Sequence, residues 1–144
     1  MARIIYVEDD DIVACVVKQA LTEAGHVVGI IDHGSLAYDA IVFKHPDLIL
    51  LDCSLPGMKG VEILRRVRAI PEIYMTPIVM LTALADPADI DAAIEAGAND
   101  YIVKPIDLVD LIQRIDAVLA NCLYKSKVSA RLSKKLALTQ PLKV

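Results

Sequence analysis

Residues 48–52 read Leu-Ile-Leu-Leu-Asp, four aliphatic side chains followed directly by a carboxylate. Such an uninterrupted apolar run is typical of a strand that is covered on both faces, as in a parallel sheet. A similar run near the N-terminus, residues 3–7, is followed by Glu8 and Asp9. The carboxyl ends of parallel strands meet at one edge of a sheet, where ligands of open α/β sheets bind. We therefore expect the three carboxylates to lie close together.

Two more apolar runs end in polar side chains of a different kind. Residues 77–81 are followed by Thr82, and residues 101–103 are followed by Lys104. If both runs are strands of the same sheet, a hydroxyl and an ammonium reach the edge that carries the carboxylates. A cation site, a carboxylate nucleophile and positively charged or hydroxyl donors are the groups that handle a phosphoryl group.

The whole chain alternates between strand-like and helix-like segments. Strands separated by helical crossovers predict a parallel sheet in a doubly wound α/β fold. Gly25 and Gly97 stand where two of the helices should end, and Pro46 stops another before the third strand. The expected strands are 3–7, 26–31, 47–51, 77–81 and 100–103, and the expected helices are 11–24, 35–44, 59–69, 88–96 and a long one from Asp107.

Length and composition limit the alternatives. The chain has 144 residues, which is about one domain, and 56% of them are hydrophobic, with one Phe and no Trp. The three cysteines lack a C-x-x-C spacing, so neither a disulfide framework nor a zinc site is expected. Neither a signal peptide nor a membrane-spanning run of about 18 apolar residues is present in the sequence. These features predict a cytoplasmic protein.

Charge is distributed unevenly along the chain. Residues 1–120 hold all 19 acids against nine basic residues, a net charge of −10, whereas residues 121–144 carry six basic residues and no acid. The acidic part should repel nucleic acid, because duplex DNA is bound mainly through neutralised phosphates. Nucleic acid is therefore not expected at residues 1–121, and only the basic tail could attract it.

Four strings, in order and in register, resemble the receiver domain of two-component response regulators, the chemotaxis-regulator-like module. The resemblance covers residues 1 to about 121 and implies a flavodoxin-like fold of five βα units with the strand order 2-1-3-4-5. We expect residues 122–144 to be a basic tail or an extension of the fifth helix. The strings are V-E-D-D at 7–10, L-L-D-C-S-L-P-G-M at 50–58, V-M-L-T-A at 79–83 and G-A-N-D-Y-I-V-K-P at 97–105.

The resemblance implies a signalling module that catalyses only its own phosphorylation and dephosphorylation. Its phosphoryl donor is a histidine kinase or a histidine phosphotransfer protein, and Asp52 is the acceptor. The implied magnesium ligands are Glu8, Asp9, Asp52 and the backbone carbonyl of Ser54. Thr82 and Lys104 are the implied phosphate contacts, and Thr82 and Tyr101 the switch residues.

The implied output is a surface, formed by the fourth helix, fifth strand and fifth helix, from about residues 85–98 and 107–119. Its partners are a downstream protein target or an output domain, and a homodimer is a further expectation; no membrane partner is expected. A stand-alone receiver and a fragment of a longer, DNA-binding regulator both remain open.

Elementary electrostatics supports magnesium independently of the resemblance. Three carboxylates held within about 4–6 Å repel one another, so they need a cation to remain ionised together. Oxygen ligands favour a hard ion, and Mg²⁺ binds through one or two carboxylates while it keeps several waters and bridges to phosphate oxygens.

Two other function classes fit the sequence less well. A metal-dependent phosphohydrolase with Asp52 as nucleophile would need a second acid two residues on, to protonate a leaving group, and Ser54 stands there. A nucleotide-binding domain would want a G-x-G-x-x-G turn after the first strand, where residues 8–11 are all acidic and would repel a pyrophosphate.

Several residues have simpler structural interpretations. Asp10 and Asp11 are expected to be the N-cap and first-turn acids of the first helix, and the ring of Tyr101 is as compatible with the core as with a switch. The three histidines, His26, His33 and His45, are expected at the surface. The Lys104-Pro105 bond is a candidate cis peptide.

Two positions depart from the pattern of the receiver family. Lys59 replaces an acid after the Pro-Gly-Met turn, which leaves its effect on cation binding or kinase docking open. Leu84 places an apolar side chain beside the path of the hydrolytic water, which suggests slow self-dephosphorylation.

Overall fold

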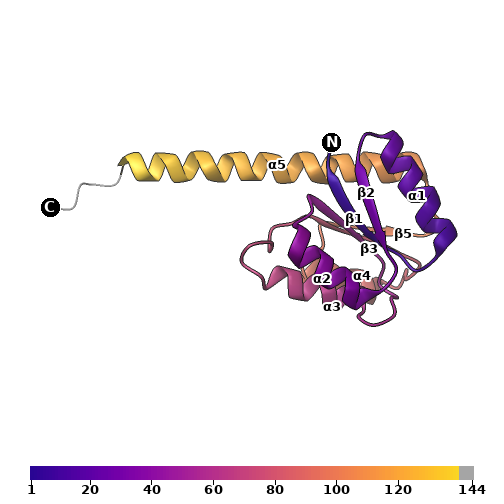
Figure 1. Ribbon diagram of the computed structural model, residues 1–144. Coiled ribbons are helices and arrows are strands. Elements are labelled where there is room, and N and C mark those ends of the chain that lie inside the picture. Colours follow the sequence, from indigo (N-terminus) through magenta and orange to yellow (C-terminus); the bar gives the residue numbers. More distant parts are fainter. Residues whose placement is uncertain (140–144) are drawn as a thin grey trace.

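The computed structural model describes the main chain of residues 1–139 and the side chains of residues 1–122 and Arg131 (Figure 1). Five parallel strands lie in the order β2-β1-β3-β4-β5, so the predicted flavodoxin-like fold is confirmed. The elements are β1 (Arg3–Val7), α1 (Asp11–Glu23), β2 (Val27–Ile31), α2 (Gly34–Lys44), β3 (Leu48–Leu51), α3 (Gly60–Arg68), β4 (Ile78–Thr82), α4 (Pro87–Glu95), β5 (Asp100–Val103) and α5 (Leu108–Thr139).

Helices cover the sheet on both faces and divide the core into two layers. Helices α1 and α5 lie on one face, and α2, α3 and α4 lie on the other (Figure 1). Along β1, Ile4 and Tyr6 pack into the α1/α5 layer, whereas Ile5 and Val7 pack into the opposite layer. Strands β3 and β4 are buried at every position. This explains their continuous apolar sequence, because a central strand has no solvent-facing side.

The strand register brings the polar residues to one edge of the sheet. Val7 pairs with Leu51, and Thr82 pairs with Val103. The residues that follow these strand ends therefore leave the sheet at the same edge, as the sequence predicted.

Local capping follows the sequence closely at the start of α1. The carboxylate of Asp10 accepts hydrogen bonds from the amides of Ile12 and Val13, and Asp11 lies in the first turn. Asp10 is therefore the N-cap and Asp11 a first-turn acid, as expected. Past the other end of the helix, Gly25 has a φ of 96°, a left-handed conformation that glycine adopts without strain.

The buried stripe of α1 is narrower than the apolar pattern suggested. Ala14, Val17 and Leu21 are buried, but Ile12 is 78% exposed and Val16 is 47% exposed. The sequence predicts one apolar stripe on this helix, of six residues that include Ile12 and Val16, and the structure leaves these two uncovered. Helical spacing defines a wide apolar arc, and the sheet covers only part of it.

His26 is buried, which corrects the expectation that all three histidines lie at the surface. Its Nδ1 accepts a hydrogen bond from the amide of Ala2 at 3.1 Å, and its Nε2 lies 3.1 Å from a carboxylate oxygen of Asp116. The ring therefore joins the amino ends of β1 and β2 to α5. His33 is half-buried and His45 is exposed.

Helix α5 is the long helix that the sequence predicted from Asp107. Leu111 and Ile115 are buried, and Leu108 and Val118 pack against the same core layer, as their helical spacing in the sequence indicates. The main chain then continues as one helix to Thr139 and extends past the sheet (Figure 1). A second set of apolar residues at helical spacing, Tyr124, Val128, Leu132 and Leu136, lies outside the residues whose side chains are described. Among the described residues, no helix combines the length and the apolar character needed to cross a membrane.

Candidate functional site

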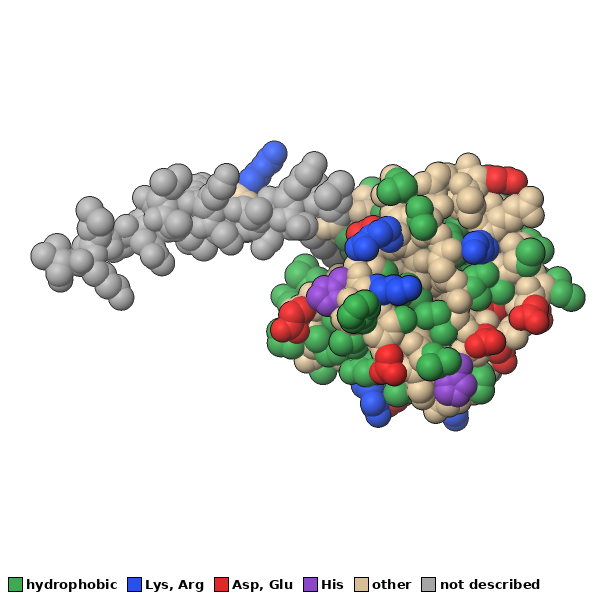
Figure 2. Space-filling view, viewed as in Figure 1, with side chains coloured by type: hydrophobic (Ala, Val, Ile, Leu, Met, Phe, Trp, Pro, Cys, Tyr) green, Lys and Arg blue, Asp and Glu red, His purple; other side chains and the backbone are tan. Residues whose placement is uncertain are grey.

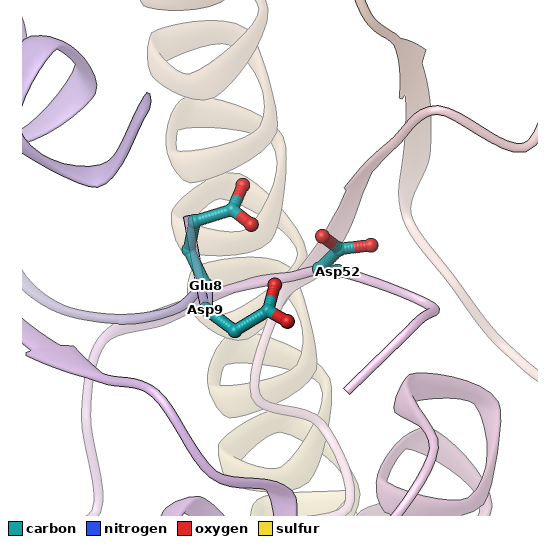
Figure 3. A group of neighbouring side chains, drawn as sticks. All are labelled: Glu8, Asp9 and Asp52. Carbon is teal, nitrogen blue, oxygen red and sulfur yellow. The ribbon is translucent and has the colours of Figure 1, made fainter. Parts of the chain in front are cut away.

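Three carboxylates converge at the carboxyl edge of the sheet (Figure 3). Glu8 and Asp9 follow β1, and Asp52 follows β3. Each offers an oxygen within 4.8 Å of an oxygen on the others. Glu8 and Asp52 are buried, with 1% and 5% exposure, whereas Asp9 is exposed. The cluster is therefore open to solvent only on the side of Asp9.

Lys104 enters this cluster from the end of β5. Its ammonium Nζ lies 3.2 Å from Oδ2 of Asp52 and also pairs with Oε1 of Glu8. The side chain of Lys104 is only 18% exposed, so water screens these pairs weakly. Together the three carboxylates and the ammonium leave two formal negative charges, which matches the charge of one divalent cation.

Hydrogen bonds fix the two buried carboxylates. The hydroxyl of Tyr6 donates to Oε1 of Glu8 at 3.0 Å, and the amide of Ser54 donates to Oδ1 of Asp52 at 3.1 Å. The role of Tyr6 could not be predicted from the sequence, because an aromatic residue in a buried strand is usually only a core residue. In the structure its ring packs in the α1/α5 layer while its hydroxyl reaches the site.

Burial and neighbours shift the pKa values of the buried carboxyls in opposite directions. Burial raises the pKa of Glu8, and the nearby Asp52 carboxylate adds to the increase, although Lys104 opposes it. Burial also opposes ionisation of Asp52, but the Ser54 amide, a hydrogen bond with Glu8 and the charge of Lys104 together hold its pKa below the usual value. Asp52 is therefore the group kept as a carboxylate, the form that a nucleophile requires.

Thr82 and Tyr101 are connected through the loop that follows β4. Thr82 is buried at the end of β4, and its Oγ1 accepts a hydrogen bond from the amide of Leu84 at 3.3 Å. The hydroxyl of Tyr101 donates to the carbonyl of the same Leu84 at 2.7 Å. Tyr101 is 7% exposed, so its ring points inward and packs in the core layer under α3 and α4.

The loop between β3 and α3 lies against the acceptor strand. The carbonyl of Asp52 lies 2.0 Å from where a Cβ on Gly60 would stand, so only glycine permits this approach. Lys59 precedes it as the exposed N-cap residue of α3 and makes no side-chain capping bond. The Lys104-Pro105 peptide, a candidate cis bond from the sequence, is cis.

The donor set suits a hard divalent cation. Within the described part of the chain, these three carboxylates form the one cluster of acidic, His or Cys side chains with a geometry that could hold a metal ion. All its side-chain donors are oxygens, which Mg²⁺ prefers over nitrogen or sulfur. The backbone carbonyl of Ser54 belongs to the exposed loop directly after Asp52, where it could add a further oxygen.

Residues 4–116 match the response regulator receiver domain family. The chain belongs to this family. Among curated relatives, it is 37% identical over 129 residues to the transcriptional regulatory protein CseB of Streptomyces avermitilis and 40% identical over 117 residues to the DNA-binding response regulator MtrA of Mycolicibacterium smegmatis. These alignments cover 90% and 81% of the chain. They cover 54% and 50% of the relatives, so the chain spans about half their length.

Solved structures agree with this family assignment. The BeF3-activated N-terminal receiver domain of RstA from Klebsiella pneumoniae is 33% identical, with a TM-score of 0.76 over 81% of this chain and 97% of that one. A receiver domain protein from Methanospirillum hungatei is 28% identical, with a TM-score of 0.81 over 87% of this chain and 98% of that one. The receiver predicted from the four sequence strings is therefore confirmed.

Proposed function

We propose that this receiver accepts a phosphoryl group on Asp52 from a phosphohistidine of a histidine kinase or of a histidine phosphotransfer protein. The observation that carries the proposal is the state of Asp52 itself. It is buried, its pKa is held low, and it lies between an open acidic cluster and the ammonium of Lys104.

The chemical step uses the carboxylate as nucleophile. An oxygen of Asp52 attacks phosphorus and forms the P–O bond of an aspartyl phosphate, while the P–N bond to the donor imidazole breaks and its electron pair returns to that nitrogen. Lys104 stabilises the negative charge on the phosphoryl oxygens, and Thr82 supplies a hydroxyl donor. Mg²⁺ held by Glu8, Asp9, Asp52 and the Ser54 carbonyl would neutralise the remaining charge.

An apolar patch gives the donor protein a place to dock beside this edge. Ile12, Val13 and Val16 of α1, together with Ile106 and Leu108, line a groove of about 210 Å³. Helix α1 begins two residues after Asp9, and Ile106 follows Lys104 by two residues. The patch therefore borders the acidic site. We propose that the exposed side chains of Ile12 and Val16 contact the donor protein.

The output surface we propose comprises α4, β5 and the first turns of α5. Tyr101 of β5 is hydrogen-bonded to the carbonyl of Leu84, whose amide bonds the hydroxyl of Thr82. Ile94 and Val109 are exposed on the adjoining helices. A downstream protein, an output domain or a second copy would bind there. The DNA-binding function in the name of MtrA belongs to that protein; for this chain, an attached DNA-binding domain in a longer regulator remains the alternative.

We place the boundary of the receiver near residue 121 and assign residues 122–144 to the basic extension of α5. The family match ends at residue 116, and the last core contacts of α5 are made by Val118 and Leu119. The net charge changes sign at about the same position.

Turnover tests the signalling function against the phosphohydrolase alternative. With excess small-molecule phosphodonor and magnesium, we expect one phosphoryl group per chain and slow release of phosphate. Rapid release of many equivalents of phosphate, abolished in Asp52→Asn, would instead indicate a phosphohydrolase.

Phosphoryl transfer from a phosphorylated histidine kinase tests the docking patch. We expect Ile12→Ser to weaken this transfer, whereas Leu36→Ser, on the distant helix α2, should leave it unchanged.

A further inference from the structure

A second apolar groove lies at the opposite edge of the sheet from the acidic site. Strand β2 is an edge strand, and its amino-terminal half is poorly covered. Val27 is 56% exposed, whereas Ile31, on the same face, packs against the core. A groove of about 240 Å³ lies here, and its lining includes Arg3, Val27, Gly29 and Lys44.

The groove is hollow at Gly29 because this residue has no side chain to fill it. Gly29 stands in the interior of β2, where glycine is less favourable than a residue with a side chain. Its φ lies outside the positive range, and a Cβ at this position would meet no heavy atom within 4 Å. Neither backbone conformation nor crowding within the chain therefore requires glycine. Such a strand position often marks a close approach by another molecule.

An exposed aromatic side chain lies beside the groove. Phe43, the one Phe of the chain, is 86% exposed and directly precedes Lys44, which lines the groove. Leu36 lies seven residues earlier on the same face of α2 and is 60% exposed. A large aromatic ring contributes about 150–250 Å² of contact area when it becomes buried. Hydrophobic and basic side chains are interspersed on the face shown in Figure 2.

We propose that this surface associates with the same surface of a second copy, with Phe43 of each chain seated in the groove of the other. An isologous two-fold contact requires a projection and a matching hollow on one patch, and Phe43 and the hollow at Gly29 provide them. The surface around the groove carries both signs of charge. Lys44 has no ion-pair partner among the described residues, and Asp39 is exposed on the same helix, whereas Asp47 already pairs with Arg3. Lys44 of one copy can therefore approach Asp39 of the other.

This contact is separate from the proposed phosphorylation response. The groove includes Arg3 and Val27, the first residues of β1 and β2, and thus lies at the amino ends of the strands. Association through it requires neither magnesium nor phosphoryl transfer. A failure of this inference therefore leaves the assignment of Asp52 intact, and the converse also holds.

Sedimentation velocity over a concentration series of the unphosphorylated chain, without magnesium, tests the proposal. We expect a reversible dimer that weakens by about tenfold or more in Phe43→Ser, as for a central aromatic contact. Gly29→Val should weaken it comparably, because the new side chain fills the groove, and valine suits a strand, so the fold is retained. Met75→Ser, in the loop before β4, is the control: Met75 is 57% exposed and lies in none of the proposed sites, so the dissociation constant should stay unchanged.

The other outcomes contradict the proposal. A chain that stays monomeric up to about millimolar concentration, the weak end of specific association, overturns it. So does a dimer that tolerates either Phe43→Ser or Gly29→Val, or a dimer lost in Met75→Ser. Thermal unfolding of each variant shows whether a lost dimer reflects a lost fold, and Phe43→Tyr, which keeps an aromatic ring at the exposed site, should retain most of the association.

Discussion

The hydroxyl of Tyr101 donates a hydrogen bond to the backbone carbonyl of Leu84 at 2.7 Å. This bond ties the strand β5 to the loop that begins at Thr82, whose own hydroxyl accepts from the Leu84 amide. A phosphoryl group on Asp52 that attracts the Thr82 hydroxyl would therefore act on the position of Leu84 and, through it, on Tyr101. Phosphorylation would shift a population between two arrangements rather than create a new fold.

Tyr101→Phe removes the hydroxyl and keeps the buried ring. We expect this variant to be phosphorylated at the parent rate but to lose coupling to α4, β5 and α5, by about 1–3 kcal/mol in partner binding. Amide exchange with and without beryllofluoride and magnesium measures the response. An exchange response equal to that of the parent chain on all three elements would show that the Leu84 bond carries no signal.

Lys104→Ala should uncouple acceptance from signalling. Asp52 retains the Ser54 amide and the magnesium ligands, so we expect slower but measurable phosphorylation. The ammonium that joins the phosphoryl group to β5 is missing, so binding of a downstream partner should no longer respond to phosphorylation. Unchanged partner affinity in phosphorylated Lys104→Ala would count against this role.

The same variant makes a prediction about stability. Without Lys104, the buried Glu8 loses the one group that opposes the effect of its burial, and Asp52 loses one of the groups that lower its pKa, so the folded-state pKa values of both should rise. The folded state then binds more protons, and the variant should lose stability relative to the parent as pH rises above about 4, the ordinary carboxyl range. Denaturant unfolding at several pH values measures this, and a difference independent of pH would contradict it.

Magnesium binding should weaken as pH falls. The pKa of Glu8 is raised, chiefly by burial, so protons compete with the ion at a higher pH than at an ordinary glutamate. Asp9→Asn should reduce the affinity by about tenfold, or ~1.4 kcal/mol, because it removes one charged ligand. Calorimetric titration measures both effects. Equal affinity in Asp9→Asn and the parent would exclude Asp9 as a ligand.

We expect the side chain of Leu84 to lengthen the lifetime of the phosphorylated state. Its side chain is 38% exposed and offers no polar atom to hold a hydrolytic water. Leu84→Asn should therefore hydrolyse the aspartyl phosphate several-fold faster, while the backbone groups that bond Thr82 and Tyr101 remain. Phosphate release from the isolated phosphorylated chains measures the rates. An unchanged rate would show that this side chain does not restrict the access of water to the aspartyl phosphate.

The residues at the strand ends were predictable because they depend on a single rule. Continuous apolar runs identify buried parallel strands, and parallel strands end at one edge, so Asp52 and Lys104 could be placed together although they lie far apart in sequence. Thr82 and Glu8 follow from the same argument. The positions of side chains within this edge, such as the pairing of Lys104 with both carboxylates, are not contained in that rule.

Features that depend on distant partners were not predictable. The burial of His26 rests on Asp116, 90 residues away, and on the amide of Ala2; a histidine at an element end offers no such signal. The exposure of Ile12 depends on the rotation of α1 about its own axis relative to the sheet, and the spacing of apolar residues does not determine this rotation. The sequence left a basic tail and an extension of the fifth helix both open for residues 122–144, because Lys125 and Ser129 interrupt the core stripe and a helix can continue without core contacts.

Mass spectrometry of the chain after treatment with a small phosphodonor and magnesium identifies the residue that accepts the phosphoryl group. We expect one phosphoryl group, located by peptide analysis on Asp52, and complete loss of the adduct in Asp52→Ala. Asp9→Asn, which keeps the acceptor, should still be modified at higher magnesium concentration. An adduct that persists in Asp52→Ala, or that maps to another residue in the parent chain, would exclude Asp52 as the acceptor.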